Sequence, residues 1–271
     1  MLVETLNDLR SPDKSDRLAA LETLVQLLAD DATPDVPDDQ RHQLRWSVAD
    51  VYCDIMRRPS VYADDLRMLA GTALPNLLRS MGDYVGADLR CADLRESASF
   101  NDCFLAGADL TKSEIAHASF ENANLHGARL RGANAWKVEL PKADLTGADL
   151  TAIAAQEATM TAAVLAGVRA VNAQFSEAKA TESVWTGATL CGANFREATL
   201  WHADFRGANL VGAQLIKVDL AGDRTTDMRG ANLTGATLDG STLSNVDLRG
   251  ANLTGASLDG VALSNVQLDG A

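Results

Sequence analysis

The sequence has few aromatic residues, few histidines and few cysteines, and each shortage excludes a class of protein. Of the 271 residues, 46% are hydrophobic but only 5% are aromatic, so the core must consist mainly of leucine and alanine. The four cysteines, Cys53, Cys91, Cys103 and Cys191, form no CxxC pair and have no histidine at zinc-ligand spacing. This argues against a zinc site and against a disulfide framework. We expect a protein of a reducing compartment, the cytoplasm.

The chain also lacks a long apolar run and a surplus of basic residues. No stretch approaches the roughly 18–20 apolar residues that a membrane-spanning helix needs. The N-terminus shows neither the basic start nor the apolar stretch of a signal peptide. Acidic residues number 37 against 24 basic ones, which gives a formal net charge of −13. Because binding to a phosphate backbone needs clustered lysine and arginine, we expect no direct nucleic-acid binding. Because no long apolar run is present, we also expect no membrane association.

A five-residue repeat dominates the chain after residue 82. Every fifth position from Phe100 to Leu220 gives 25 positions, of which 18 are Leu or Phe, and Ala occupies 18 of the 25 positions two residues earlier. A period of five fits neither the helix period nor the strand period. It fits a coil in which each unit forms one side. The large residue and the small residue before it then point inward, and the other three positions face water.

Segments such as GADLT at 107–111, GANLV at 207–211 and GANLT at 230–234 resemble the A(D/N)LXX motif of pentapeptide-repeat proteins. The resemblance covers residues 83–271 and implies a right-handed quadrilateral β-helix with four pentapeptides per coil. A longer period supports four sides, because residues 229–248 match residues 249–268 at 16 of 20 positions. At a strand spacing of ~4.8 Å, the repeat region forms about nine coils.

Two breaks interrupt the register of the repeat. One extra residue lies near Glu96–Ser97, between the inward positions 94 and 100. Eight residues instead of five separate the inward positions 220 and 228, which leaves Asp223-Arg224-Thr225 as an insertion. This extra loop is either a functional element or a tolerated insertion, and the sequence leaves both interpretations open.

Residues 1–82 lack the repeat and show helical patterns instead. Apolar residues at helical spacing predict amphipathic helices over residues 16–30, 39–58 and 62–80, and a short helix over residues 2–10. The predicted fold is therefore mainly β, a β-helix over residues 83–271 preceded by a small all-α domain over residues 1–82. Because the open first coil of a solenoid exposes apolar side chains and strand edges, we expect this domain to cap it. Whether it also binds a partner stays open.

No pattern indicates catalysis, a metal or a cofactor. His42, His117, His126 and His202 are too scattered for a metal site, and we interpret them as solvated surface residues. Phosphate-binding and nucleophile motifs are absent. The recurring Gly-Ala pairs are attributed to a need for small residues where the coil turns. We predict a non-enzymatic protein without a cofactor.

The centre of the repeat is less regular than its ends. Ala155, Ala170 and Ala180 occupy inward positions where a large residue is expected, and Trp185 fills another such position. Ile153 and Val168 stand two residues before the first two alanines and return part of the lost volume. Either the core repacks here, which we favour, or the coil opens into a groove.

Exposed tryptophans, uncompensated carboxylates and the insertion supply the candidate binding residues. Trp136 and Trp201 each follow an inward position and should face solvent, and tryptophan is favoured in protein contacts. Asp239 and Asp259 stack in adjacent coils with no cation two residues away. In contrast, a column of Asp204, Asp227 and Asp247 runs beside a compensating column of Arg206, Arg229 and Arg249. The candidate partner-binding residues are Asp239, Asp259, Trp136, Trp201, Asp223 and Arg224.

The sequence therefore predicts a non-catalytic rod that binds another macromolecule, a protein. Quinolone-resistance members of the resembled family are acidic rods that imitate DNA and bind DNA gyrase. The first alternative is accordingly a gyrase-binding DNA mimic that gives antibiotic resistance or self-protection. This chain departs from those members in its helical domain and in ending on repeat sequence. A continuous acidic face would favour the mimic, whereas a polar pocket near Trp185 would favour the second alternative, an enzyme or small-molecule binder.

Overall fold

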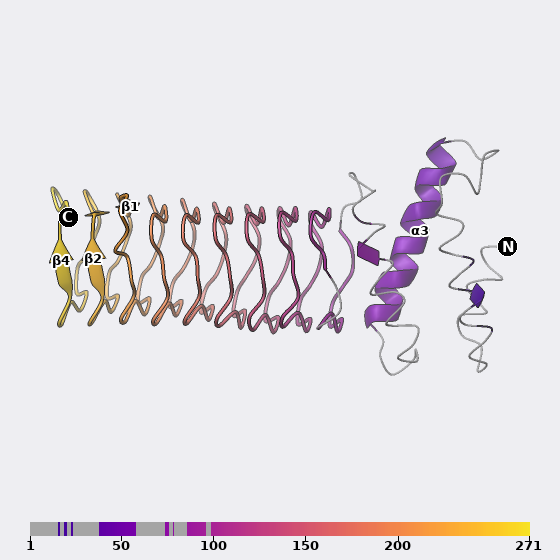
Figure 1. Ribbon diagram of the computed structural model, residues 1–271, viewed down its shortest axis with the longest axis horizontal. Helices are drawn as coiled ribbons and strands as arrows, with labels where there is room; N and C mark the ends of the chain where they lie inside the picture. The colour runs from indigo at the N-terminus through magenta and orange to yellow at the C-terminus, as the bar shows by residue number, and fades with distance from the viewer. Residues whose placement is uncertain are drawn as a thin grey trace.

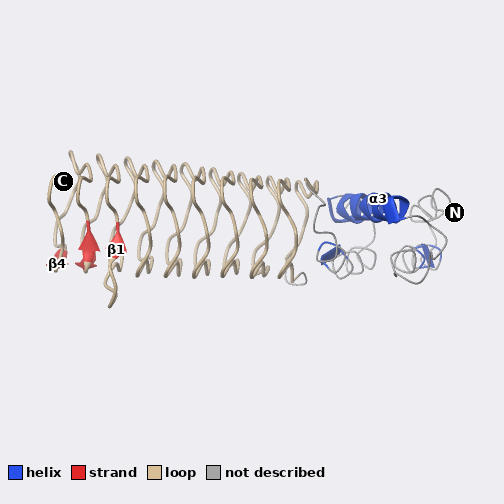
Figure 2. Ribbon diagram, turned by 90° about the horizontal axis from the view of Figure 1, so that it is seen from above, coloured by secondary structure: helices blue, strands red, loops and turns tan. Residues whose placement is uncertain are grey.

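The computed structural model is a rod of stacked coils with a helical part at its N-terminal end (Figure 1). It describes residues 38–57, 86–95 and 99–271, and the single residues 16, 19, 20, 23, 74, 75 and 78. The coils follow one another in chain order from the helical part to the C-terminus, and a view from above shows the same arrangement (Figure 2).

Each coil takes twenty residues and stacks in parallel on the next. Backbone bridges recur every five residues and join residues twenty positions apart, such as Ser119 with Glu139 and Glu139 with Thr159. Two of the pairings extend into short strands, which gives β1 (Thr226–Asp227), β2 (Thr242–Ser244), β3 (Val246–Asp247) and β4 (Ala262–Ser264). Strand β1 pairs with β3 and β2 with β4, both in parallel. Four pentapeptides therefore complete one coil, and the described residues from 86 onward form a β-helix.

The inward positions fill the interior as the five-residue period predicts. Every fifth residue from Phe100 to Leu220 is buried, and so is each described residue two positions earlier. Burying a leucine or phenylalanine side chain contributes about 1.5–3 kcal/mol relative to leaving it in water. The repeated burial of these side chains therefore drives the coil to form. In the last coil Leu258, Leu263 and Leu268 are exposed, because no coil of the structure lies over them.

Both register breaks lie where the sequence places them. Ser99 bridges to Ser119 at the regular spacing, whereas Asp88 bridges to Asp109, one position further along the chain than that spacing gives. The chain therefore has one extra residue between the bridge of Asp88 and the bridge of Ser99. Asp204 bridges to Asp227, three positions beyond the regular spacing, and Asp227 pairs onward with Asp247 at the regular spacing. The stacking of coils is thus the same on either side of the insertion.

The turns between the sides of the coil require a left-handed backbone conformation, with positive φ. They do not require a small side chain. The second residue of each turn has positive φ, and glycine fills many of these positions, for example Gly127 at 63°. Lys112, Lys137 and Lys142 adopt the same conformation at 57°, 54° and 57°. The interpretation of the Gly-Ala pairs as a need for small residues is therefore wrong. Glycine recurs because it adopts the left-handed conformation without the steric penalty of a Cβ atom.

Helix α3 (Asp38–Arg57) confirms the helix predicted over residues 39–58 to within one residue at each end. The helices predicted over residues 2–10, 16–30 and 62–80 lie mainly outside the described residues, although residues 16, 19, 20, 23, 74, 75 and 78 are helical. Val48, Tyr52 and Ile55 of α3 belong to the same buried hydrophobic cluster as Leu89 and Leu94 of the first coil. Among the described residues, no helix is long and apolar enough to cross a membrane.

An ion-pair network joins the end of α3 to the first coil. Arg57 pairs with Asp88, and its Nη2 lies 2.8 Å from Asp54 Oδ1. Arg90 Nη2 lies 2.8 Å from Asp88 Oδ2. The hydrogen bond from Arg90, together with the positive charge of Arg57, lowers the pKa of Asp88 to about 2.

The Asp88 network should make the junction sensitive to acid. Because the pKa of Asp88 is lowered in the folded protein, its contribution to stability is present above pH ~4, the pKa range of an unfolded aspartate. That contribution is lost as the pH falls toward about 2. We expect Asp88→Asn to unfold at lower urea concentration than the wild type at pH 7, with the difference shrinking on acidification. A constant difference between pH 7 and pH 2.5 would contradict this account. Asp149→Asn is the control, because Asp149 lies in the same column of bridges.

Candidate functional site

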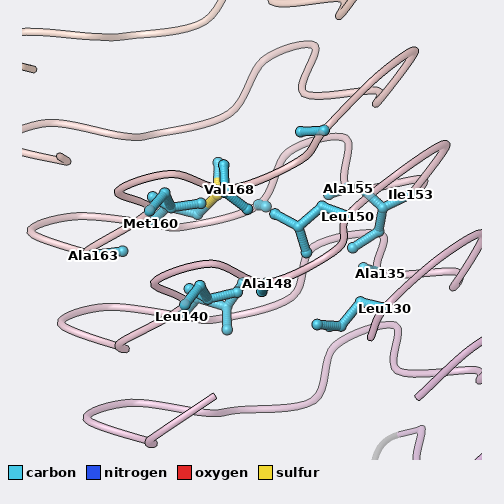
Figure 3. Packing of buried hydrophobic residues seen from close by; sticks show 14 of the residues in the cluster. Leu130, Ala135, Leu140, Ala148, Leu150, Ile153, Ala155, Met160, Ala163 and Val168 are labelled. Atoms are coloured by element: carbon cyan, nitrogen blue, oxygen red, sulfur yellow. The ribbon is translucent and has the colours of Figure 1, made fainter. Parts of the chain in front are cut away.

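The irregular centre of the coil is a filled core. Ala155, Ala170 and Ala180 are 1%, 0% and 0% exposed, and Ile153 and Val168 beside them are also buried. In the close view, the side chains of Leu150, Ile153, Met160 and Val168 occupy the interior around Ala155 (Figure 3). The preferred prediction, that the core repacks around the small residues, agrees with this burial.

Trp185 is packed into the core on three sides by aromatic rings. Its ring centroid lies 5.4 Å from that of Phe175, 5.5 Å from that of Phe195 and 5.8 Å from that of Phe205. Its Nε1 donates a hydrogen bond of 2.7 Å to Ser183 Oγ, so the one polar atom of the side chain is satisfied inside the core. The proposed groove therefore has no basis at these residues, and the enzyme alternative loses the feature on which it rested.

All six candidate binding residues lie in the turns beside one column of bridges. We call this column the Ser99 face: Ser99, Ser119, Glu139, Thr159, Lys179, Thr199, Asp219, Thr242 and Ala262. Trp136, Asp239 and Asp259 each stand three residues before a member of the face, in a row that we call the Trp136 turns. Trp201 and the insertion with Asp223 and Arg224 follow the face, in a row that we call the Trp201 turns. Residues far apart in the sequence thus border a single surface.

Trp136 is exposed and held in place by three neighbours. It is 40% exposed, and the His117 ring meets it edge-on at 4.7 Å between ring centroids. Lys137 Nζ lies 4.4 Å from the centroid of the indole ring. Trp136 Nε1 donates to Glu157 Oε1 at 3.1 Å, and Lys137 Nζ lies 3.2 Å from Glu157 Oε2. The hydrogen bonds from Lys137 and Trp136 hold the pKa of Glu157 below its ordinary value.

The insertion folds back over His202. The His202 side chain is only 12% exposed, with Nε2 2.8 Å from Asp223 Oδ1 but outside hydrogen-bond geometry. Arg224 lies 3.4 Å from His202 Nδ1 and pairs with Glu182. The interpretation of His202 as a solvated surface residue is therefore wrong, because the loop covers it. Trp201, directly before it, is 39% exposed.

Asp239 and Asp259 stack as predicted, and their contacts are with neutral groups. Asp239 Oδ1 accepts hydrogen bonds from Ser257 Oγ at 2.6 Å and from the backbone N of Asp259 at 3.0 Å. Within the described part of the chain, no lysine or arginine comes within ion-pair distance of either carboxylate; the nearby Lys217 pairs with Glu197. The two charges are therefore open to a partner.

The longest acidic column is neutralised by arginine. The Nη2 atoms of Arg206, Arg229 and Arg249 lie 2.6, 2.6 and 2.7 Å from the carboxylates of Asp204, Asp227 and Asp247. Each of the first two arginines also reaches the aspartate of the next coil, at 3.7 and 3.6 Å. The predicted compensation is confirmed, and this side of the rod presents no continuous acidic face.

The described residues also offer no metal centre. Within the described ranges, no group of three His, Cys, Asp or Glu side chains could hold a metal ion. The four cysteines all lie in the described part of the chain and form no disulfide with one another; Cys53 and Cys103 are buried and Cys91 is exposed.

Sequence reasoning missed four residues that shape this surface: His117, Lys137 and Glu157 around Trp136, and Glu182 as the partner of Arg224. A signal was available for Lys137 and Glu157, which are twenty residues apart and therefore stack in adjacent coils. Opposite charges at this spacing predict an ion pair in a coil of twenty residues. The spacing gives no signal for Glu182, because its partner Arg224 belongs to the insertion.

Comparisons with known proteins agree with the repeat. A family model described as pentapeptide repeats matches in eight copies, over residues 86–127, 123–161, 143–179, 158–196, 186–222 and 226–265. The matched segments leave out residues 223–225, the insertion. No curated protein sequence matches the chain.

Three solved structures are similar to this chain. HetL, a pentapeptide repeat protein involved in heterocyst differentiation regulation in Nostoc sp. strain PCC 7120, is 30% identical, with 68% of this chain and 84% of that chain covered and a TM-score of 0.33. QnrB1, a plasmid-mediated fluoroquinolone resistance protein, is 22% identical, with 65% and 78% covered and a TM-score of 0.27. AT2G44920, a pentapeptide repeat protein of the Arabidopsis thaliana thylakoid lumen, is 26% identical, with 46% and 70% covered and a TM-score of 0.24.

The five-residue period, the twenty-residue coil and the family match point to the same assignment. The family model matches residues 86–222 and 226–265, which is more than half of the chain. The chain belongs to the family of pentapeptide repeat proteins.

Proposed function

We propose that this protein is a non-catalytic rod that binds another protein through the Ser99 face and the turns beside it. The observation that carries the proposal is that two exposed tryptophans border this one face, Trp136 before it and Trp201 after it. Tryptophan is among the residues that contribute most to protein–protein binding, and a side chain held in place before binding loses little freedom on contact. We infer that the coil closes as a right-handed quadrilateral, so that the face is a flat side between two edges.

The DNA-mimic alternative receives less support from the surface. A mimic needs carboxylates that stand free along the rod, and the column of Asp204, Asp227 and Asp247 is occupied by arginines. Asp239 and Asp259 stand free as a stacked pair, but the other described carboxylates without an ion-pair partner, such as Glu139 and Asp219, are separated by neutral or basic residues along the rod. Binding that depends on the tryptophans would favour the Ser99 face over a DNA-like surface.

The helical part is proposed to be a cap. Its support is that Val48, Tyr52 and Ile55 of α3 share a buried cluster with the first coil, and that Arg57 pairs with Asp88. The acid titration of Asp88→Asn also tests this role, because a cap that is released in acid should expose the first coil.

Removing both tryptophans should weaken partner binding. Purified full-length protein would capture its partner from an extract of the organism that encodes it. The partner would be identified by mass spectrometry and titrated again in pure form. We expect Trp136→Ala with Trp201→Ala to weaken its affinity at least about tenfold. Val211→Ala is the matched control, since Val211 is 36% exposed but lies after Asn209 on another side of the coil. Equal affinities of the double variant and the control would disprove the proposed surface.

A further inference from the structure

The side chains of Trp136 and Glu157 already hold a cation, the ammonium group of Lys137. Lys137 Nζ lies 4.4 Å from the centroid of the Trp136 ring and 3.2 Å from Glu157 Oε2. An ammonium or guanidinium group is attracted by the face of an indole ring, and a carboxylate beside the ring adds a charge-assisted hydrogen bond. The turn therefore combines the two groups that recognise a cation in proteins.

The rest of this site is fixed before any partner arrives. His117 packs against Trp136 at 4.7 Å between ring centroids, and Trp136 Nε1 is held by Glu157 Oε1 at 3.1 Å. His117, Lys137 and Glu157 have φ values of 60°, 54° and 56°, so each stands at the second position of its turn in three successive coils. Lys137 is held less firmly than Trp136, because the ion pair that holds it is exposed: the Lys137 and Glu157 side chains are both 40% exposed. An exposed pair of this kind contributes little and can be exchanged.

We propose that Trp136 and Glu157 form a binding site for an arginine or lysine side chain of a partner protein, and that Lys137 occupies this site in the free protein. The inference rests on the proposed function, since it names the chemistry of the partner that the Ser99 face binds. Arginine suits the site better than lysine, because its planar guanidinium can stack on an indole ring and bond a carboxylate at the same time. Binding then replaces an internal contact with an intermolecular one and leaves no charge unpaired, because the displaced Lys137 is released into water.

The charges around the site favour a basic partner segment. Glu139 and Asp219 on the Ser99 face and Glu177 in the Trp136 turns have no lysine or arginine within ion-pair distance in the described chain. Lys179 is the one basic residue of the face, and Arg196 and Lys217 of the Trp136 turns both pair with Glu197. Asp239 and Asp259 continue the row of Trp136 turns toward the C-terminus. A segment that places one arginine on Trp136 therefore meets further carboxylates along the rod, which favours arginine- or lysine-rich partners over acidic ones.

The decisive variant removes a positive charge that competes with the partner. The probe is a fluorescein-labelled peptide of five Arg-Ser repeats, titrated with full-length protein in 50 mM salt and followed by anisotropy. We expect Lys137→Met to bind it about threefold more tightly than the wild type, because the site is vacated. Lys112→Met is the matched control: Lys112 has the same left-handed backbone, at 57°, on a turn beside another side of the coil. We expect Glu157→Gln and Trp136→Leu each to weaken binding about threefold or more.

The outcomes separate this inference from the function on which it rests. An equal gain from Lys137→Met and Lys112→Met would show that only overall charge matters and would overturn the cation site. Absence of binding by the Arg-Ser peptide, or equal binding of a Glu-Ser peptide, would overturn it as well. If capture of the natural partner still depended on Trp136 and Trp201 in those cases, the Ser99 face would remain the binding surface and only the chemistry of the partner would be wrong.

Discussion

Replacing Leu210 with aspartate is expected to destabilise the rod by at least about 4 kcal/mol. Leu210 is fully buried, between the inward Leu190 of the preceding coil and Leu233 of the following one. Losing the leucine alone costs about 2–5 kcal/mol through lost packing, and the new carboxyl group finds no partner in the core. Urea denaturation followed by circular dichroism measures the effect.

The neighbouring residue provides the control for this substitution. Val211 follows Leu210 directly and is 36% exposed, so Val211→Asp should change stability by less than about 0.5 kcal/mol. The two changes introduce the same group one residue apart. If they shifted the urea midpoint equally, the assignment of inward and outward positions would be wrong for this side of the coil.

Truncation of the buried tryptophan should have the second largest effect. Trp185→Ala is expected to cost about 3–5 kcal/mol, because the cavity is lined by rings that cannot move together. Phe175, Phe195 and Phe205 belong to other units of the coil, and backbone hydrogen bonds between coils fix each of them, such as Phe195 N to Gln214 O at 2.8 Å. The change also leaves Ser183 Oγ without its donor.

Thermal unfolding of Trp185→Ala would be compared with that of Trp201→Ala. Trp201 is 39% exposed and Trp185 is fully buried, so removing Trp201 deletes a side chain of the same size with a smaller loss of buried area. We expect a large fall in melting temperature for the first variant and a smaller one for the second. Similar melting temperatures would mean that the centre of the rod is open and not packed.

Much of the fold follows from the sequence because one short period repeats over most of the chain. A five-residue spacing of Leu and Phe identifies the buried residues, and shifts in that spacing locate the insertion at residues 223–225 before any coordinates are known. The same periodicity correctly paired Asp204, Asp227 and Asp247 with the arginines beside them. Because residues twenty positions apart stack in adjacent coils, the sequence alone shows which residues are neighbours.

Reasoning from the period fails where the chain leaves it. The burial of His202 depends on a loop that folds back across the preceding coil, and no spacing rule describes that path. The contact of Lys137 with the Trp136 ring depends on the side-chain conformation of a residue with φ of 54°, which composition does not show. Glycine at many equivalent positions hid the fact that the turn also accepts a long, charged residue.

The insertion at residues 223–225 has a consequence for how such a rod can change during evolution. The spacing between bridged residues grows by the length of the insertion from Asp204 to Asp227 and is regular again from Asp227 to Asp247. The added residues therefore leave through a turn, and the bridges on either side keep their pairing. The turn itself changes, because His202 N donates to Thr226 Oγ1 where the equivalent residue Glu182 N donates to the backbone O of Trp201. A new loop can be tried at a single turn without redesigning the fold, much as variable loops are exchanged on an antibody framework. In the regular units, two positions of each five-residue unit are buried and the other three lie at the surface, so selection can alter the surface residues while the core stays constant.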